Sequence, residues 1–206
     1  TAYARGIEDA IINGDTSATH QDSDVTSSND VRKVWNGMRK HALAAAKIDA
    51  NDVVSVATMR KMLQAMGNYG RPGTTLAVTN SVGYWKAITQ ADVLTVDKYG
   101  AMASILSGEV GKILGIAPII WSDKVREDLN ESGVYDGVTT NETEIILSYQ
   151  KAYAIGIKRG VSVESKKDIE TDQIIMVVTG RMDVQPRYDT TTEKMVGVLY
   201  DINTGT

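Results

Sequence analysis

The chain has 206 residues, a formal net charge of −4 and no cysteine, which excludes disulfides, thiolate metal ligands and a cysteine nucleophile. An apolar content of 42% and a charged content of 23% are ordinary for a globular domain. The mild negative charge argues against a surface that coats nucleic acid.

The first predicted element is a helix over the N-terminal residues. Tyr3, Ile7, Ala10 and Ile11 recur at helical spacing, and Asn13-Gly14 supplies a stop signal. Because a natural chain rarely begins inside an element, we expect this chain to be a fragment. Residues 13–30 show no apolar period, so we expect a solvated loop that carries several acidic residues, namely Asp15, Asp22, Asp24 and Asp30.

Two further amphipathic patterns predict helices. The first has an apolar face formed by Val31, Val34, Trp35, Met38 and Ala42, although Gly37 in its middle costs about 1 kcal/mol relative to alanine. The remainder of that pattern is basic and is expected to be a solvated face, comprising Arg32, Lys33, Arg39, Lys40 and Lys47.

The third helix is predicted from a stripe of apolar residues at helical spacing. Asp49 is the expected N-cap, and Gly67 stands at the favoured position just past the C-terminal end. The stripe itself consists of Val56, Met59, Leu63 and Met66.

Strands dominate the rest of the chain. Leu76–Thr79 and Ala117–Trp121 have the composition of buried strands, with a helix near Tyr84–Thr89, and residues 124–142 read as irregular surface. Strands are also expected within residues 143–165. We expect the last section to form a hairpin, in which 174–184 pairs with 195–200 across the turn at 189–191. Early helices and late strands favour an α+β fold over alternating βαβ units.

The glycine-rich segment before the strand at 117–121 must first be tested as a phosphate loop. Such a loop needs four residues between its first glycine and a Gly-Lys pair, followed by Ser or Thr. Here two residues separate Gly108 from Gly111-Lys112, and Ile113 follows. The segment is therefore not a phosphate loop.

The run from Gly111 to Ile119 (Gly-Lys-Ile-Leu-Gly-Ile-Ala-Pro-Ile) instead resembles a glycine–proline strand of tailed-phage major capsid proteins with the Hong Kong 97-type fold. Ile11-Ile12-Asn13-Gly14-Asp15 resembles the end of that family's spine helix. Trp35-Asn36-Gly37-Met38 resembles a further glycine step, and Leu76-Ala77-Val78-Thr79-Asn80 resembles a strand that ends in Asn before a helix. The chain departs from the family pattern at two positions. Ala117 directly precedes Pro118 and lengthens the glycine–proline step slightly, and Ser81 follows Asn80 where the family more commonly has Pro.

This resemblance implies a discontinuous peripheral (P) domain with an axial (A) domain inserted into it. Residues 1–48, with the end of the spine helix, and residues 160–206, with a β-hairpin, would form the P domain. Residues 49–159 would form the A domain. The N-terminal arm and the long hairpin called the E-loop would precede the chain and be absent from it.

The resemblance also implies a structural function rather than an enzymatic one. The protein would be a subunit of an icosahedral phage capsid, self-assembling into pentamers and hexamers around double-stranded DNA. It would be assembled in the bacterial host cytoplasm and located in the virion, with portal, scaffold or decoration proteins as further partners. The alternative is the shell subunit of an encapsulin-like nanocompartment, which shares the fold and encloses an enzyme cargo.

Exposed apolar residues at the strand-rich end support an assembly role. Long hairpins with alternating faces and unpaired edges invite packing against other copies. No run of about 18 apolar residues is present, so we expect no membrane contact.

Enzymatic and metal-binding alternatives have weaker support. His20 and His41 are interpreted as solvated, because nothing in the sequence places either beside a carboxylate and a nucleophile. The acidic stretch from Asp22 to Asp30 lacks the Gly and Glu of a calcium loop, since Ser27 and Lys33 stand at those positions. We expect no catalytic residue, no metal ligand and no cofactor.

Paired carboxylates and basic positions leave two questions open. Glu127-Asp128 and Glu142 with Glu144 could serve a hydrolase if they faced a cleft, although surface charge is the favoured interpretation. The basic positions from Arg32 to Lys47 carry no RNA-binding signature. They form either a solvated face or a surface that matches an acidic loop of a neighbouring subunit.

Overall fold

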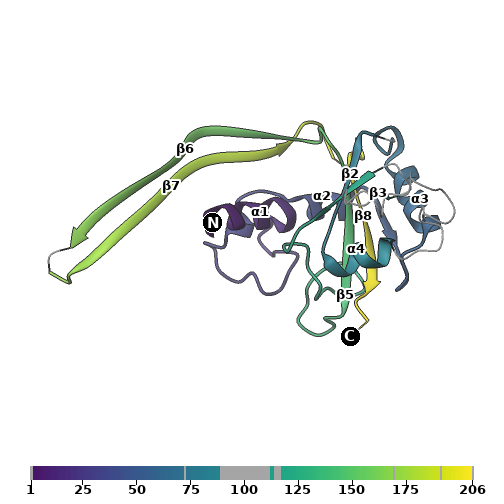
Figure 1. Ribbon diagram of the computed structural model, residues 1–206, viewed down its shortest axis with the longest axis horizontal. Helices are drawn as coiled ribbons and strands as arrows, with labels where there is room; N and C mark the ends of the chain where they lie inside the picture. The colour runs from purple at the N-terminus through teal and green to yellow at the C-terminus, as the bar shows by residue number, and fades with distance from the viewer. Residues whose placement is uncertain are drawn as a thin grey trace, which may run out of the picture.

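The computed structural model describes residues 2–71, 73–88, 112–113, 117–168, 170–190 and 192–205. Within them a mixed sheet forms the body of the molecule, and a long two-stranded arm projects from it (Figure 1). The strand order across the sheet is β1 (Lys47–Asp49), β8 (Val196–Asn203), β5 (Glu142–Tyr149), β2 (Thr75–Thr79), β4 (Ala117–Trp121) and β3 (Lys112–Ile113). The α+β prediction is confirmed, because β1–β8 and β2–β4 are parallel and the other pairs are antiparallel.

Helices pack on both faces of this sheet. The described helices are α1 (Ala2–Asn13), α2 (Met38–Ala45), α3 (Val56–Ala65) and α4 (Ser81–Ile88), and two short 3₁₀ turns are η1 (Val31–Lys33) and η2 (Gly67–Tyr69). Among the described residues, none of the helices has the length and apolar content needed to span a bilayer.

Strand alternation divides the core into two layers. Successive residues of β5 point to opposite faces, so Ile145 and Leu147 pack with α3 and α4, whereas Ile146 packs with α1 and α2. All three side chains are fully buried. Both faces of β5 are therefore covered, which explains its nearly uninterrupted apolar run.

The first and third predicted helices are confirmed. Gly67 follows the end of α3 with a φ of +58°, which is the left-handed conformation that glycine adopts without steric cost. The predicted cap was wrong: Ser55, not Asp49, caps α3, because its hydroxyl accepts a hydrogen bond from the Thr58 amide at 3.1 Å. Asp49 ends strand β1 instead.

The second predicted helix is interrupted. A 3₁₀ turn ends at Lys33, and α2 begins only at Met38. Gly37 lies against the end of α1, where its amide donates a hydrogen bond to the Gly14 carbonyl at 2.8 Å. A β-carbon at Gly37 would lie 2.8 Å from the Ile12 carbonyl oxygen, so this close approach requires glycine and prevents a continuous helix. Val31 and Val34, predicted to be buried, are 38% and 56% exposed.

The strand at 76–79 and the helix after it form as predicted, and Asn80 joins them. Its Oδ1 accepts a hydrogen bond from the Gly83 amide at 2.8 Å, which caps the first turn of α4. Its Nδ2 donates to the Arg126 carbonyl at 3.2 Å and contacts Thr143 Oγ1 at 2.5 Å. One buried amide thus connects β2, α4, β5 and the 122–141 loop.

The strand at 117–121 is also confirmed as β4, while residues 89–111 and 114–116, including Gly108 and Gly111, lie outside the described residues.

The predicted late hairpin pairs differently from our expectation. Residues 174–184 belong to β7 (Gln173–Pro186), which pairs with β6 (Tyr153–Asp168), and not with residues 195–200. Residues 196–203 form β8, which lies inside the sheet between β1 and β5. Period-two alternation identifies a strand but not its partner, and the almost complete burial of β8 suits a central strand.

The predicted division into P and A domains stays a prediction. The expected boundary at residues 159 and 160 falls inside the continuous strand β6. The main sheet combines strands from both expected domains, with β1 and β8 beside β5 and β2.

Replacement of Asn80 by Ala should destabilise the body by about 2 kcal/mol. It removes the α4 cap and the hydrogen bonds that the Asn80 amide makes to Thr143 and to the Arg126 carbonyl, although these two groups keep their own hydrogen bond at 2.7 Å. The free energy of unfolding, measured by urea titration, tests this expectation. The exposed Asn29→Ala is the matched control, and an Asn80→Ala stability equal to that of the control would contradict the role assigned to Asn80.

Candidate assembly surface

The arm formed by β6 and β7 extends well beyond the body (Figure 1). It is antiparallel, with Tyr153 opposite Pro186 at the base and Asp168 opposite Gln173 at the tip. At about 3.3 Å per residue, strands of this length reach roughly 50 Å.

One face of the arm carries an apolar stripe. Residues directly opposite each other in an antiparallel pair share a face, so Val178 and Val163 lie on the same side as Met176 and Ile174. Ser165 and Lys167, which lie opposite Met176 and Ile174, share this face. The exposed fractions of Val163, Ile174, Met176 and Val178 are 64%, 66%, 69% and 49%. We call these four residues the apolar stripe.

The opposite face of the arm is more polar. Val177 lies there opposite Glu164, and Ile175 lies opposite Lys166. Ser162 and Thr179 form a hydrogen bond between their hydroxyls at 2.8 Å. Both faces of the arm carry apolar and polar side chains, and the face with the apolar stripe is the more apolar of the two.

The base of the arm is anchored to α1. Trp35, Ala10 and Val184 form a small buried cluster against which Met182 and Tyr153 pack. Closer to the tip, the Tyr3 side chain lies directly against Gly180, where a β-carbon would clash with it. Gly180 is two residues from Val178 and therefore lies on the same face of β7. Tyr3 of α1 thus covers the inner end of the face that carries the stripe, and the stripe itself is exposed.

Such a surface is unfavourable in an isolated molecule. A two-stranded ribbon is marginally stable in water without a further layer, and an exposed contiguous apolar patch marks an interaction site. The expectation that exposed apolar residues gather at the strand-rich end is therefore confirmed, although the strands are β6 and β7.

Buried charges hold the loop of residues 14–30, which follows α1. Arg39, Asp22 and Glu144 have fully buried side chains; Arg39 Nη2 pairs with Asp22 Oδ2, and Arg39 Nε lies 3.8 Å from Glu144 Oε1. Asp22 also accepts a hydrogen bond from the Tyr135 amide at 3.0 Å. Burial raises the pKa of Glu144 to about 8, and the attraction of Arg39 only partly opposes this rise.

This burial corrects the predictions that Arg39 lies on a solvated face and Asp22 in a solvated loop. The Gly14–Gly37 contact fixes α2 against α1, and residues 14–30 fold over Arg39. The rest of the basic set divides between two environments: Lys40 pairs with Asp15 at 2.9 Å, whereas Lys47 is exposed on β1.

Two further arginines surround this core. Arg126 makes a bidentate pair with Asp128, with both N···O distances 2.8 Å, and lies 4.2 Å from the centre of the Tyr135 ring. Asp24 lies 3.0 Å from both Arg126 and Arg32, and Asp30 lies 3.0 Å from Arg32. The acidic residues weighed as a calcium loop are thus engaged by arginines.

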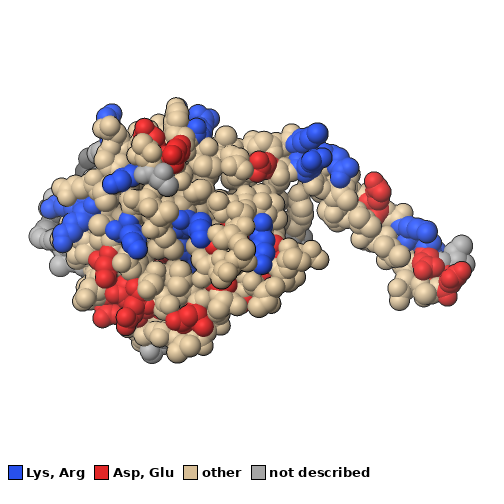
Figure 2. Space-filling model, turned by 180° about the vertical axis from the view of Figure 1, so that it is seen from behind, with Lys and Arg blue, Asp and Glu red and all other residues tan. Residues whose placement is uncertain are grey.

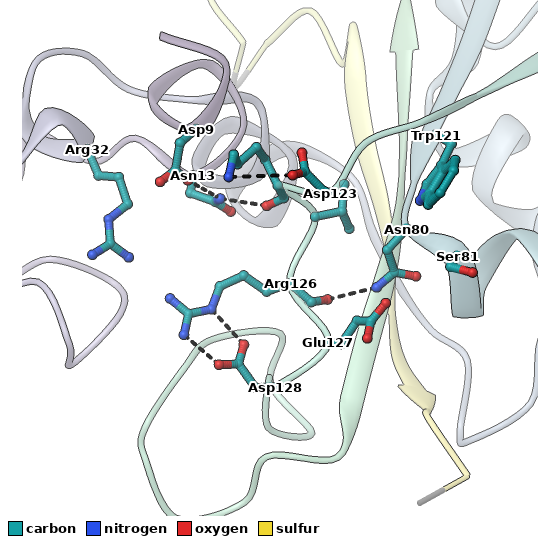
Figure 3. A pocket seen from close by; sticks show the side chains of 12 residues that line it. Asp9, Asn13, Arg32, Asn80, Ser81, Trp121, Asp123, Arg126, Glu127 and Asp128 are labelled. Atoms are coloured by element: carbon teal, nitrogen blue, oxygen red, sulfur yellow. Dashed lines mark hydrogen bonds and ion pairs between the residues drawn. The ribbon is translucent and has the colours of Figure 1, made fainter. Parts of the chain in front are cut away.

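Figure 3 shows a cleft of about 530 Å³ beside these residues, lined by Asp9, Asn13, Trp121 and the 123–128 segment. Asp128 turns toward Arg126, whereas Glu127 extends to the other side of the segment. The Asn13 amide donates to the Lys124 carbonyl at 2.8 Å, which fixes the cleft wall to α1. Asp128 is therefore committed to an ion pair, and the geometry offers no pair of free carboxyls at Glu127-Asp128.

The second candidate pair is also divided. Glu144 faces Arg39, whereas Glu142 lies near Asp52 and Asp201, and the strand register shifts between Thr143 and Ile145. The two glutamates therefore belong to different groups of charges.

The histidines have structural partners. The prediction that His20 is solvated was wrong: it is 7% exposed, and its Nδ1 accepts a hydrogen bond from the Asp22 amide at 3.0 Å. His41 is half-buried, and its Nδ1 lies 3.0 Å from the Thr190 hydroxyl. Burial lowers the pKa of His41, which favours the neutral ring.

Comparison with known proteins shows which solved structure this fold is similar to. No protein-family profile matches the sequence, and no curated protein matches it. The chain is similar in fold to a chain of the bacteriophage PhiM1 mature capsid, with a TM-score of 0.52 and 10% identity. The match covers 96% of this chain and 60% of that chain, so this chain spans less than two thirds of the capsid chain's length. The chain has a phage capsid-like fold.

Replacement of Arg39 by Met should destabilise the protein by roughly 3–5 kcal/mol, because the buried Asp22 would lose its nearest cation and keep only the more distant Arg126, at 3.9 Å. Urea unfolding near neutral pH measures the loss. Arg60→Met, at an exposed position of α3, is the matched control and should change stability by less than about 0.5 kcal/mol. Equal stabilities for the two variants would contradict the role of the buried charges.

Asp15 should contribute to stability at neutral pH. Burial opposes its ionisation, but hydrogen bonds from Ser17, Lys40 and Gln21 prevail and lower its pKa from 3.8 to about 2. A lowered folded-state pKa gives stability that is present above pH 4 and is lost as the pH falls toward 2.

Asp15→Asn should therefore cost about 2 kcal/mol at pH 7 and lessen the loss of stability between pH 4 and 2. Unfolding free energies measured across this range test the prediction. Asp172→Asn, at a side chain that is 89% exposed, should leave the pH profile unchanged. A wild-type profile in Asp15→Asn would refute the assignment.

Proposed function

We propose that the protein is a structural subunit of an icosahedral phage capsid, in which many copies assemble into pentamers and hexamers around double-stranded DNA. The observation that carries the proposal is the uncovered apolar stripe on a projecting arm, in a chain whose fold is similar to that of a phage capsid chain. A surface of this kind serves assembly better than it serves catalysis.

The proposed mechanism is the burial of the stripe by a second copy. Each half-exposed aliphatic side chain transferred from water contributes about 1–2 kcal/mol. Four such residues give a modest contact per subunit, and the symmetry of a closed shell repeats that contact many times. The subunit then needs no reactive site, and its function is distributed over its contact surfaces.

The finer features of the proposal follow the Hong Kong 97-type arrangement. The P domain would comprise residues 1–48 and 160–206, and the A domain residues 49–159. The protein would not be an enzyme. It would be assembled in the host cytoplasm and located in the virion, beside portal, scaffold or decoration proteins.

An encapsulin-like compartment would use the same contacts but enclose an enzyme. The similarity to a phage capsid chain favours the virion. The contents of purified particles separate the two, because the capsid would contain DNA and the compartment a protein cargo.

Met176→Glu should abolish or strongly reduce assembly, because a charge in the centre of the stripe would have to be buried at the contact. Assembly of the full-length protein is measured by light scattering and negative-stain electron microscopy. Val177→Glu, on the opposite face of the same strand, is the matched control and should assemble. Closed shells formed by Met176→Glu would contradict the proposed contact, and the absence of any assembly in the wild type would contradict the proposed function.

A further inference from the structure

Three carboxylates from distant parts of the chain converge where β8 ends and β5 begins. Asp52 follows β1, Glu142 is the first residue of β5, and Asp201 lies near the end of β8. One oxygen from each lies within 4.8 Å of the others. Figure 2 shows acidic side chains gathered along the lower part of the body in that view.

A buried oxygen without a partner distinguishes this group from an ordinary acidic patch. Glu142 is 2% exposed, and its Oε2 has no hydrogen-bond partner among the residues that the structure describes. Its Oε1 accepts only a long hydrogen bond from the Asn203 amide, at 3.3 Å. Within the described part of the chain, Asp201 Oδ1 is likewise buried without a hydrogen-bond partner. Unpartnered buried carboxylate oxygens are costly, so the site is built for a ligand that supplies positive charge.

The surrounding charges reinforce this view. Burial raises the pKa of Glu142 to about 7, and the charges of Asp201, Asp52 and Glu131 raise it further, although Lys86 opposes them. Burial and Asp49 raise the pKa of Asp201 to about 6. Lys86 Nζ itself donates to the Asn203 backbone carbonyl. Among the described residues named here, the acidic groups outnumber Lys86.

The backbone holds the three carboxylates in place. Asp52 and Asp201 have φ angles of +67° and +57°, and the Asp52 amide donates to the Asp201 carbonyl at 2.9 Å. Asn203, which contacts Glu142, also accepts a hydrogen bond from the Gly205 amide at 2.7 Å. The backbone hydrogen bond between Asp52 and Asp201 therefore holds the residue after β1 beside the end of β8.

We propose that Asp52, Glu142 and Asp201 bind a divalent cation, with Ca²⁺ as the preferred ion. Ca²⁺ accepts oxygen ligands at 2.3–2.6 Å in irregular arrangements, so two ligands on opposite sides of the ion lie up to about 5 Å apart. Mg²⁺ requires near-ideal octahedral geometry at about 2.0–2.1 Å and is seldom bound by an all-protein set of carboxylates, so it is expected to bind less well. Water molecules complete the coordination, since Asp52 is exposed. The ion joins the β1–β8 edge of the sheet to the start of β5.

The test is binding of Ca²⁺ alone, measured by isothermal titration calorimetry and thermal unfolding of the chain after treatment with chelator. We expect one ion per chain and a melting temperature that rises with Ca²⁺ concentration, because the ion binds the folded state preferentially. Mg²⁺ should bind at least tenfold more weakly. The absence of saturable Ca²⁺ binding to the wild type would overturn the proposal.

Asp52→Asn and Glu142→Gln should each weaken Ca²⁺ binding at least tenfold. Asn tolerates the left-handed backbone at residue 52, so this exposed variant keeps the test valid even if Glu142→Gln fails to fold. Glu142→Gln should also raise the melting temperature in chelator, since it removes like-charge repulsion. Glu164→Gln, on the exposed arm, is the matched control with wild-type binding. Wild-type affinity in Asp52→Asn would overturn the site, and this result is independent of whether the protein forms shells.

Discussion

The apolar stripe of the β6–β7 arm is exposed to water, and this exposure is the constraint around which the molecule is organised. A two-stranded ribbon has no interior, because each residue faces one side or the other and neither side is enclosed. Tyr3 of α1, together with Trp35 from the segment before α2, covers the inner end of the arm, and the stripe beyond them is exposed. The stripe therefore needs a further apolar surface to cover it, and in the proposed capsid a second copy would supply that surface.

The body supplies a rigid base for this arm. Gly14 and Gly37 bring α1 and α2 into backbone contact, and the buried group of Arg39, Asp22 and Glu144 secures the loop that lies over them. Buried ion pairs seldom add net stability relative to apolar packing, but removal of one partner is costly, so they favour one arrangement of the chain over others. The base of the arm packs on this body through contacts more than a hundred residues apart in sequence, such as those in the cluster of Ala10, Trp35 and Val184.

Local signals allowed much of the fold to be predicted. The helical spacing around Ile7 and Ile11, the C-terminal Gly67 and the strand ending in Asn80 all depend on short-range chemistry, and each is found where it was expected. The motifs that resemble capsid proteins proved to be neighbours in space, since the Asn13-Gly14 and Asn36-Gly37 segments touch. An apolar, exposed strand region at the end of the chain was expected as well.

Features that depend on long-range pairing were not predictable. Alternation in residues 174–184 identified a strand, but the choice of β6 over β8 depends on burial in the complete sheet. Arg39 looked like part of a basic surface because the loop that buries it carries no apolar pattern. The cation site escaped notice because Asp52, Glu142 and Asp201 meet only after β1, β5 and β8 have paired.

Photo-cross-linking from the arm tests the central claim most directly. The chain contains no cysteine, so Met176→Cys provides a single attachment point for a benzophenone maleimide within the stripe. In the assembled protein, irradiation should give covalent dimers whose cross-links, mapped by mass spectrometry, join position 176 to a second copy. Attachment at Val177→Cys on the other face should give far fewer. Cross-links found only within one chain, or none at all, would contradict the account.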